Sequence, residues 1–150
     1  MIKTFTSNSE EDTINLAQQI AKIARVGDIF ALNGTLGVGK SVFARAFVQA
    51  LTGAKEVPSP TFTLVQMYVA PEFDIYHYDL YRLKSPQEMF ELNVEEAFFS
   101  GVSLVEWPEK MGVLTPRNMW QIDFQTEGNT RIITISSDDA QKMQRLENVG

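Results

Sequence analysis

A stretch of eight residues in the first third of the chain has the residue types needed to hold phosphate groups. Residues 34–41 read Gly-Thr-Leu-Gly-Val-Gly-Lys-Ser and fit the spacing G-x-x-x-x-G-K-[ST]. Glycines let successive backbone N–H groups point into one concavity, and a following helix adds its positive N-terminal end. The Lys40 ammonium would reach the β- and γ-phosphates, and the Ser41 hydroxyl would ligate magnesium. The structural alternative is a plain glycine turn between a strand and a helix.

A phosphate loop also needs a carboxylate near the magnesium ion, and two predicted strands end in one. Glu106 closes the apolar run 102–105, and Asp79 closes the segment 76–78. Either carboxylate would hold a magnesium-bound water or orient the attacking water. An acid at a strand end is otherwise an ordinary surface residue, but the phosphate loop favours function for both, more strongly for Glu106.

Three further side chains have both a functional and a structural interpretation. His77 would relay a proton, but a histidine flanked by tyrosines is more often a packed, hydrogen-bonded side chain, and we favour that interpretation. Trp107 is either a partly exposed stacking or docking residue or part of the core. Thr61, in a loop punctuated by proline, would either sense the γ-phosphate as switch threonines do or cap a strand.

The hydrophobic pattern places these residues between the strands and helices of an α/β domain. We expect a helix that begins at a capping box over 7–10 and ends at Gly27, then a buried strand over 28–33. The further elements expected are a helix over 42–51, paired strands over 62–68 and 73–79, a helix start at 85–88, a helix over 93–99, a strand over 102–106, a hairpin of 120–124 with 132–135, and a helix after 138. This order predicts a single domain over residues 1–150 with a P-loop NTPase-like three-layer fold. Its mixed sheet would have a parallel core and antiparallel edge strands.

Composition excludes several other kinds of chemistry. The chain has 150 residues with no cysteine and one histidine, which excludes a thiolate nucleophile, a Cys-ligated zinc and a multi-histidine metal site. The net charge of -6 disfavours extensive contact with a nucleic-acid backbone. No apolar run approaches the roughly 20 residues needed to cross a bilayer, and the first residues lack a signal-peptide pattern. We therefore expect a cytoplasmic protein without membrane contact.

Beyond the phosphate loop, three blocks of sequence resemble the TsaE (YjeE) family, the bacterial ATPases of tRNA threonylcarbamoyladenosine biosynthesis. The blocks are Ser-Pro-Thr-Phe-Thr-Leu-Val at 59–65, His-Tyr-Asp-Leu-Tyr-Arg-Leu at 77–83 and Leu-Val-Glu-Trp-Pro-Glu at 104–109. They stand in family order, and the resemblance covers roughly residues 10 to 110. The three blocks together are far more specific than the phosphate loop alone.

The resemblance implies ATP hydrolysis with Mg²⁺ in support of two partner proteins, TsaB and TsaD, whose complex modifies tRNA. It implies contact with tRNA only indirectly, through that complex. The nucleotide-binding residues so implied or read from the motif are Gly34, Thr35, Leu36, Gly37, Val38, Gly39, Lys40, Ser41, Val42 and Arg131, the last near the base. The catalytic, metal-binding and switch residues are Lys40, Asp79, Glu106 and Thr61, with Ser41 and Glu106 on the metal and Trp107 in a functional Glu-Trp pair.

The loop departs from the family's commoner sequence, G-D-L-G-A-G-K-T. Thr35, Val38 and Ser41 replace Asp, Ala and Thr. Serine keeps the metal-binding hydroxyl, and Val38 lies where the backbone does the binding. These departures leave the expectation of ATP binding intact.

Two other classes of function stay open on the sequence. A small P-loop kinase shares the loop but usually needs an arginine-rich lid, and residues 84–101 contain no arginine. A nucleotide-dependent binding module would bind ATP without significant catalysis. As an ATPase the protein should be slow, because no arginine finger is evident, although Arg45 and Arg82 are candidate internal cations.

Overall fold

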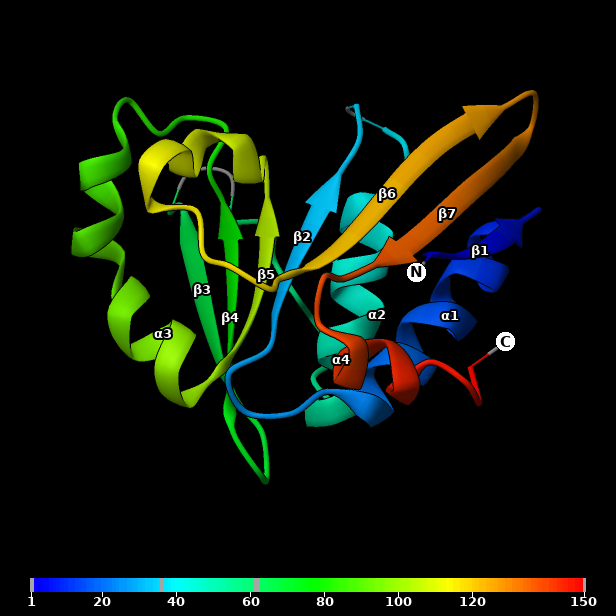
Figure 1. Ribbon diagram of the computed structural model, residues 1–150, viewed down its shortest axis with the longest axis horizontal. Coiled ribbons are helices and arrows are strands. Elements are labelled where there is room, and N and C mark those ends of the chain that lie inside the picture. The colour runs from blue at the N-terminus through cyan, green and yellow to red at the C-terminus, as the bar shows by residue number, and fades with distance from the viewer. Residues whose placement is uncertain (1, 36, 61–62, 150) are drawn as a thin grey trace.

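A seven-stranded mixed sheet organises the computed structural model, which describes residues 2–35, 37–60 and 63–149 (Figure 1). The strands are Ile2–Ser7 (β1), Ile29–Asn33 (β2), Val65–Val69 (β3), Asp74–Asp79 (β4), Val102–Glu106 (β5), Trp120–Glu127 (β6) and Thr130–Ser136 (β7). The α-helices are Glu10–Ile23 (α1), Lys40–Thr52 (α2), Val94–Ser100 (α3) and Ala140–Arg145 (α4). Two 3-10 helices, Pro86–Leu92 (η1) and Pro108–Leu114 (η2), complete the set in the described ranges.

The sheet has the predicted parallel core with antiparallel edges. Its strand order is β1-β7-β6-β2-β5-β4-β3. The four central strands, β6, β2, β5 and β4, run parallel to one another. β3 pairs antiparallel with β4 at one edge, and β7 and β1 extend the other edge in antiparallel fashion. The predicted α/β fold class is therefore confirmed.

Helices cover both faces of the sheet, which gives three layers (Figure 1). Successive residues of a strand point to opposite faces. Phe30 and Leu32 of β2 therefore pack in one apolar cluster with α1 and α2, together with residues of α4. Ala31 between them packs in a second cluster with residues of η1, α3 and η2. Both faces are buried, as the continuous apolar run of this strand predicts.

The first strand was not expected from the sequence. β1 pairs antiparallel with β7, and Phe5 lies opposite Ile133. Half of this edge strand faces solvent, so its residues lack the strong apolar signal of a central strand. Its pairing partner lies at the far end of the chain, where no local pattern can reveal it.

The start of α1 differs from the predicted capping box over 7–10. Ser7 is the last residue of β1, and Ser9 is the N-cap of α1. The Asp12 backbone N–H donates to the Ser9 hydroxyl at 3.2 Å. The Asp12 carboxylate in turn accepts from the Asn8 backbone N–H at 2.9 Å. The predicted capping box over 7–10 is therefore wrong: the cap is Ser9, and the Asp12 side chain binds the N–H of Asn8 and not that of the cap residue.

The predicted end of α1 at Gly27 is also wrong. The helix ends at Ile23 with Ala24 as its C-cap. Gly27, with a φ of 90°, lies in the turn before β2 and donates its N–H to the carbonyl of Gly101 at 2.8 Å. The glycine serves the turn and not the helix.

The remaining predicted elements are present with small shifts of boundary. α2, β5, the β6–β7 hairpin, α3 and α4 lie at the predicted positions, and the predicted start at Ser85 begins the 3-10 helix η1. β3 begins at Val65, whereas the prediction began at Phe62, which lies outside the described residues. The 3-10 helix η2 was not predicted. No helix among the described residues is long and apolar enough to cross a bilayer.

Candidate active site

The loop between β2 and α2 is bent by glycines in backbone conformations that L-residues avoid. Gly34 has a φ of 147° and Gly39 a φ of 112°. At Gly34 a Cβ atom would lie 2.8 Å from Val38 Cγ1 and 2.9 Å from the carbonyl oxygen of Phe124. Gly39 is the N-cap of α2, and the first turn of that helix therefore starts directly from the loop. This geometry presents the N-terminal end of α2 toward the loop, as an anion site requires.

Lys40 is held inside this loop by two contacts. Its side chain is buried, with 4% of the residue exposed, and Nζ donates to the carbonyl of Gly34 at 2.6 Å. Nζ also lies 4.0 Å from the centroid of the Trp107 ring, in a cation–π contact. Burial lowers the pKa of Lys40, and the negative charges of Glu106, Glu109 and Asp79 partly oppose that shift. The ammonium is thus already desolvated at the mouth of the loop.

The two predicted acids lie side by side at the carboxyl ends of parallel strands. Asp79 of β4 is in register with Glu106 of β5, which is in turn in register with Leu32 of β2. Both acidic residues are buried, at 7% and 4% exposure. Strand alternation places Glu106 on the same sheet face as Leu104, which packs in the cluster with α2. The carboxylates therefore lie on the side of the sheet where α2 begins with Lys40.

Glu106 has a close partner on the neighbouring strand. His77 Nε2 lies 2.7 Å from Glu106 Oε2, and His77 is 3% exposed. The histidine is therefore packed and hydrogen-bonded, as we favoured from its flanking tyrosines. Ser41 and Arg45 of α2 line a small cavity of about 10 Å³ together with His77. The expected metal-binding serine and His77 therefore line the same cavity.

Trp107 follows Glu106 in a left-handed conformation, with φ 59° and ψ 51°. Trp107 is half-buried. Its position is therefore intermediate between the partly exposed docking residue and the core residue that the sequence left as alternatives. One neighbour is Lys40, and the other is the ring of Tyr81, whose centroid is 5.1 Å away. Tyr81 itself is 52% exposed. Trp107 therefore connects the phosphate loop with a surface aromatic residue.

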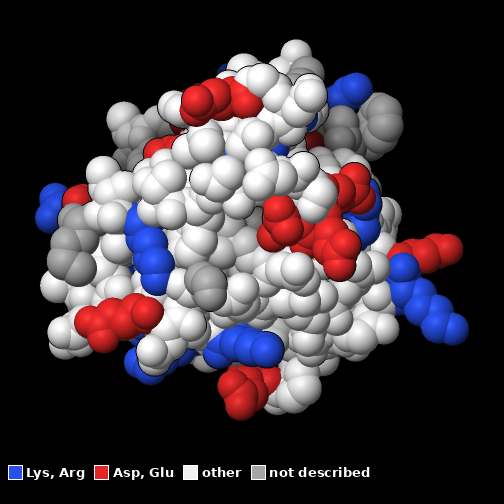
Figure 2. Space-filling model, turned by 90° about the vertical axis from the view of Figure 1, so that its right-hand side faces the viewer, with Lys and Arg blue, Asp and Glu red and all other residues white. Residues whose placement is uncertain are grey.

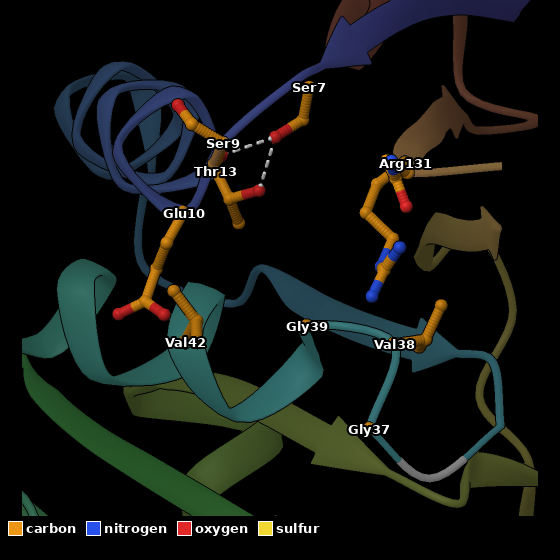
Figure 3. Close-up of a pocket in the computed structure, with 10 residues that line it drawn as sticks. Ser7, Ser9, Glu10, Thr13, Gly37, Val38, Gly39, Val42 and Arg131 are labelled. Carbon is orange, nitrogen blue, oxygen red and sulfur yellow. Dashed lines mark hydrogen bonds between the residues drawn. The ribbon is translucent and has the colours of Figure 1, made fainter. Parts of the chain in front are cut away.

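A second part of the site lies on the other side of the loop, where Arg131 extends from β7 toward Val38 and Gly39 (Figure 3). The cavity there has a volume of about 240 Å³. Its lining residues are Ser7, Ser9, Glu10, Thr13, Gly37, Val38, Gly39, Val42, Asn129 and Arg131. Predicted nucleotide-binding residues from the loop, from α2 and from β7 thus share one cavity.

The sequence did not identify the wall that the β1–α1 junction contributes to this cavity. Ser7 is in register with Arg131 across the β1–β7 pair. The Ser7 hydroxyl lies 2.7 Å from that of Thr13 and donates to the carbonyl of Ser9 at 2.8 Å (Figure 3). Only the pairing of the two chain ends brings these hydroxyls to the loop, so no local signal would have revealed them.

Two predicted site residues, Leu36 and Thr61, lie outside the described residues. Thr35 lies exposed in the loop, whereas Val38 is buried at 3% exposure against Gly34. Val42 faces the cavity from the first turns of α2.

The oxygen atoms at this site suit a cation that prefers oxygen ligands and that is also bound by the phosphates of a ligand. Among the described residues, no group of three or more His, Cys, Asp or Glu side chains is arranged to hold a metal ion alone. A hydroxyl on α2 and two strand-end carboxylates remain, and magnesium is usually bound by one or two protein oxygens plus substrate phosphates. The site therefore fits a magnesium ion that arrives with a phosphate ligand.

Comparisons with known proteins agree on one family. The family model for "Threonylcarbamoyl adenosine biosynthesis protein TsaE" matches residues 7–133. The tRNA threonylcarbamoyladenosine biosynthesis protein TsaE of Rickettsia bellii (strain RML369-C) is 41% identical over 133 residues, covering 87% of this chain and 92% of that protein. The protein of the same name from Bacillus subtilis (strain 168) is 36% identical over 129 residues, covering 85% of this chain and 80% of that protein.

A solved structure extends the similarity to the fold. The crystal structure of Bacillus subtilis YdiB superposes with a TM-score of 0.80 at 27% sequence identity, covering 99% of this chain and 94% of that one. The matched region includes the loop, both strand-end acids and Arg131. On these sequence and structural matches, the chain belongs to the TsaE family of threonylcarbamoyl adenosine biosynthesis proteins.

Proposed function

We propose that the protein is a cytoplasmic magnesium-dependent ATP hydrolase that serves threonylcarbamoyladenosine modification of tRNA. The observation that carries this proposal is the placement of Lys40 beside two strand-end carboxylates. Asp79 and Glu106 are in register on parallel strands, and both act electrostatically on the Lys40 ammonium. A buried cation next to oxygen donors at a helix N-terminus is what a metal-bound triphosphate needs.

In this proposal each residue has a separate task. Lys40 exchanges the carbonyl of Gly34 for the β- and γ-phosphate oxygens. Ser41 and Glu106 hold the magnesium ion or its water, and Asp79 shares the acidic site. Thr61 is the proposed γ-phosphate switch. Bound magnesium would neutralise charge that develops on the phosphates, while Glu106 or Asp79 orients the attacking water.

The cavity beside Arg131 is the proposed place for the ribose and base of ATP. It opens on Gly37 and Gly39 of the phosphate loop, so a nucleotide could extend from one part of the site to the other. Val42 supplies an apolar surface and Arg131 a planar cation that can stack on a base. A ligand that uses both parts would bind more tightly than inorganic phosphate alone.

The proposed partners are homologues of TsaB and TsaD, whose complex would contact tRNA. On the face that carries α1 and α4, acidic and basic side chains are interspersed, which does not favour a long phosphate backbone (Figure 2). The net charge of -6 also disfavours direct binding of a nucleic-acid backbone. Trp107 and Tyr81 form the proposed contact by which a partner could sense the state of the phosphate loop.

The test is the rate of phosphate release from ATP, measured with and without the TsaB–TsaD complex. We expect slow magnesium-dependent hydrolysis by the protein alone and a change in rate or nucleotide affinity with the partners. Glu106→Gln keeps the volume of the side chain, removes its charge and should lower the rate strongly. ATP binding without any phosphate release, even with partners present, would contradict a role as a hydrolase.

A further inference from the structure

We propose that His77 is a positioning residue that fixes the carboxylate of Glu106, holding Oε2 so that Oε1 is presented to the magnesium-bound nucleotide. The inference rests on the proposed function for what Glu106 does. It adds a residue that neither the glycine-rich motif nor the expected set of acids includes. The structural observation behind it, the contact between the two side chains, is independent of that function.

The contact is short, buried and set by the sheet. His77 Nε2 lies 2.7 Å from Glu106 Oε2, with both residues less than 5% exposed. His77 is in register with Leu104, two positions before Glu106 on the same face of β5. In the described part of the chain, the Glu106 carboxylate has no other hydrogen-bond partner. His77 is therefore the group that determines its orientation there.

The hydrogen-bond pattern assigns the direction of this contact. Nδ1 of His77 is buried and has no hydrogen-bond partner among the described residues. A buried donor without an acceptor is costly. The tautomer with its proton on Nε2 places that proton in the bond to Glu106, and leaves Nδ1 without one. His77 therefore donates to Glu106, and Glu106 Oε2 is the acceptor of this bond.

Without this hydrogen bond, the Glu106 carboxylate would be attracted to the Lys40 ammonium. Glu106 exerts the largest of the opposing charge effects on Lys40, ahead of Glu109 and Asp79. A carboxylate released from His77 would be drawn toward that ammonium, and Oε1 would no longer be held toward the magnesium-bound nucleotide. A misplacement of about 1 Å at a reacting group can cost about 100-fold in rate. His77 would thus act on catalysis without contact with the nucleotide.

The first test reads the contact directly and needs no enzyme activity. His77 is the one histidine of the chain, so a ¹⁵N–¹H correlation spectrum of labelled protein shows a single imidazole without assignment. We expect the Nε2–H tautomer with a slowly exchanging proton in the wild type. Loss of that protected proton is expected in Glu106→Ala. An Nδ1–H tautomer, or a spectrum unchanged by Glu106→Ala, would overturn the inference.

The second test uses two matched amide replacements. The amide nitrogen of His77→Gln lies near the position of Nε2 and can donate to Glu106, whereas that of His77→Asn lies near Nδ1 and cannot reach it. We expect His77→Asn to lower kcat at least about 10-fold with nucleotide affinity changed less than about threefold, and His77→Gln to restore most of the rate. Thermal unfolding of both variants separates this effect from loss of folding.

The outcomes of the two tests distinguish the inference from the proposed function. Wild-type hydrolysis together with an unimpaired His77→Asn would overturn the positioning role alone. Absence of hydrolysis by the wild type would overturn the proposed function, and the spectrum would still decide whether His77 holds Glu106.

Discussion

Lys40 is a cation that has already lost most of its water before any ligand binds. Burial lowers its pKa, and its ammonium is satisfied by the Gly34 carbonyl and the face of Trp107. A phosphate group offers a charged acceptor in place of a neutral one, and hydrogen bonds to charged groups are the stronger kind. The resting contacts therefore keep the lysine near its proposed position without competing strongly with a ligand.

Trp107 should report the movement of that lysine. Binding of Mg–ATP should draw the Lys40 ammonium off the indole and change the fluorescence of Trp107. Trp120, the other tryptophan of the chain, is fully buried and stacks on Phe30, so its emission should stay constant. A stopped-flow or steady-state titration checks this, with Trp107→Phe as the control. A nucleotide-dependent signal that survives in Trp107→Phe would contradict the assignment.

Two glycines of the loop allow a matched comparison of stability. Gly34→Ala places a Cβ against Val38 and the Phe124 carbonyl, and should destabilise the fold by about 2–4 kcal/mol through overpacking and backbone strain. Gly37→Ala, with a φ of 77° and no atom within 4 Å of the added Cβ, should cost about 1–2 kcal/mol. Urea unfolding measures both. Equal losses would show that contact at Gly34 is unimportant.

At the scale of elements, the C-terminal helix α4 is fixed to the start of β2 by a buried ion pair. Arg145 donates from both terminal nitrogens to the two oxygens of Asp28 at 2.8 Å, and also to the carbonyl of Ile23 at 2.6 Å. Asp28 is 2% exposed. A buried charge that loses its partner is strongly destabilising, because its desolvation is no longer compensated.

Removal of that arginine should therefore loosen α4. Arg145→Met is expected to lower the free energy of unfolding by about 3 kcal/mol. Lys142→Met, which removes a more exposed amine 3.7 Å from Asp28, should cost less than about 1 kcal/mol. Chemical denaturation compares the two variants. A larger loss for Lys142→Met would mean that the bidentate pair is not what holds the helix.

The cap of α4 gives a prediction for pH. The backbone N–H of Gln141 donates to the Asp139 carboxylate, and this bond is the main cause that lowers the pKa of Asp139. The folded-state pKa is below the unfolded value of 3.8, so the stabilisation is complete above that pH and is lost as the pH falls through the folded-state pKa. Asp139→Asn keeps the acceptor but has no charge to lose.

The stability difference between wild type and Asp139→Asn should therefore shrink as the pH falls below 3.8. Thermal unfolding measured at several pH values between neutral and strongly acid conditions checks this. A difference that stays constant over the whole range would show that the charge of Asp139 does not stabilise α4.

A helix or strand is predicted well when its own hydrophobic pattern defines it, and poorly when it depends on a partner far away in the sequence. The bounds of β5 are predicted correctly because all its residues are buried and three of its first four residues are apolar. β1 is missed because half of it is exposed and its partner is β7. The cap at Ser9 is misplaced because Ser7 and Ser9 both have hydroxyls, and only the strand that ends at Ser7 distinguishes them.

At the scale of the whole molecule, the site is assembled by strand order and not by nearness in sequence. Lys40, Asp79 and Glu106 come from three separated segments, and the glycine-rich motif with an acid at each of two strand ends predicts a shared site for them. Their meeting depends on β2, β5 and β4 being neighbours. The serines and threonine opposite Arg131 depend on β1 joining β7, a pairing for which the sequence gives no signal.

The central claim is that the loop over 34–41 holds a metal-bound triphosphate, and calorimetric titration with Mg–ATP tests it most directly. We predict saturable one-to-one binding by the wild type. Lys40→Ala should weaken binding at least about 10-fold, as loss of a charge-assisted hydrogen bond worth about 1.5–3 kcal/mol implies. Lys22→Ala, on the exposed surface of α1, should bind like the wild type. Equal affinity of Lys40→Ala and wild type, or no binding by either, would contradict the account.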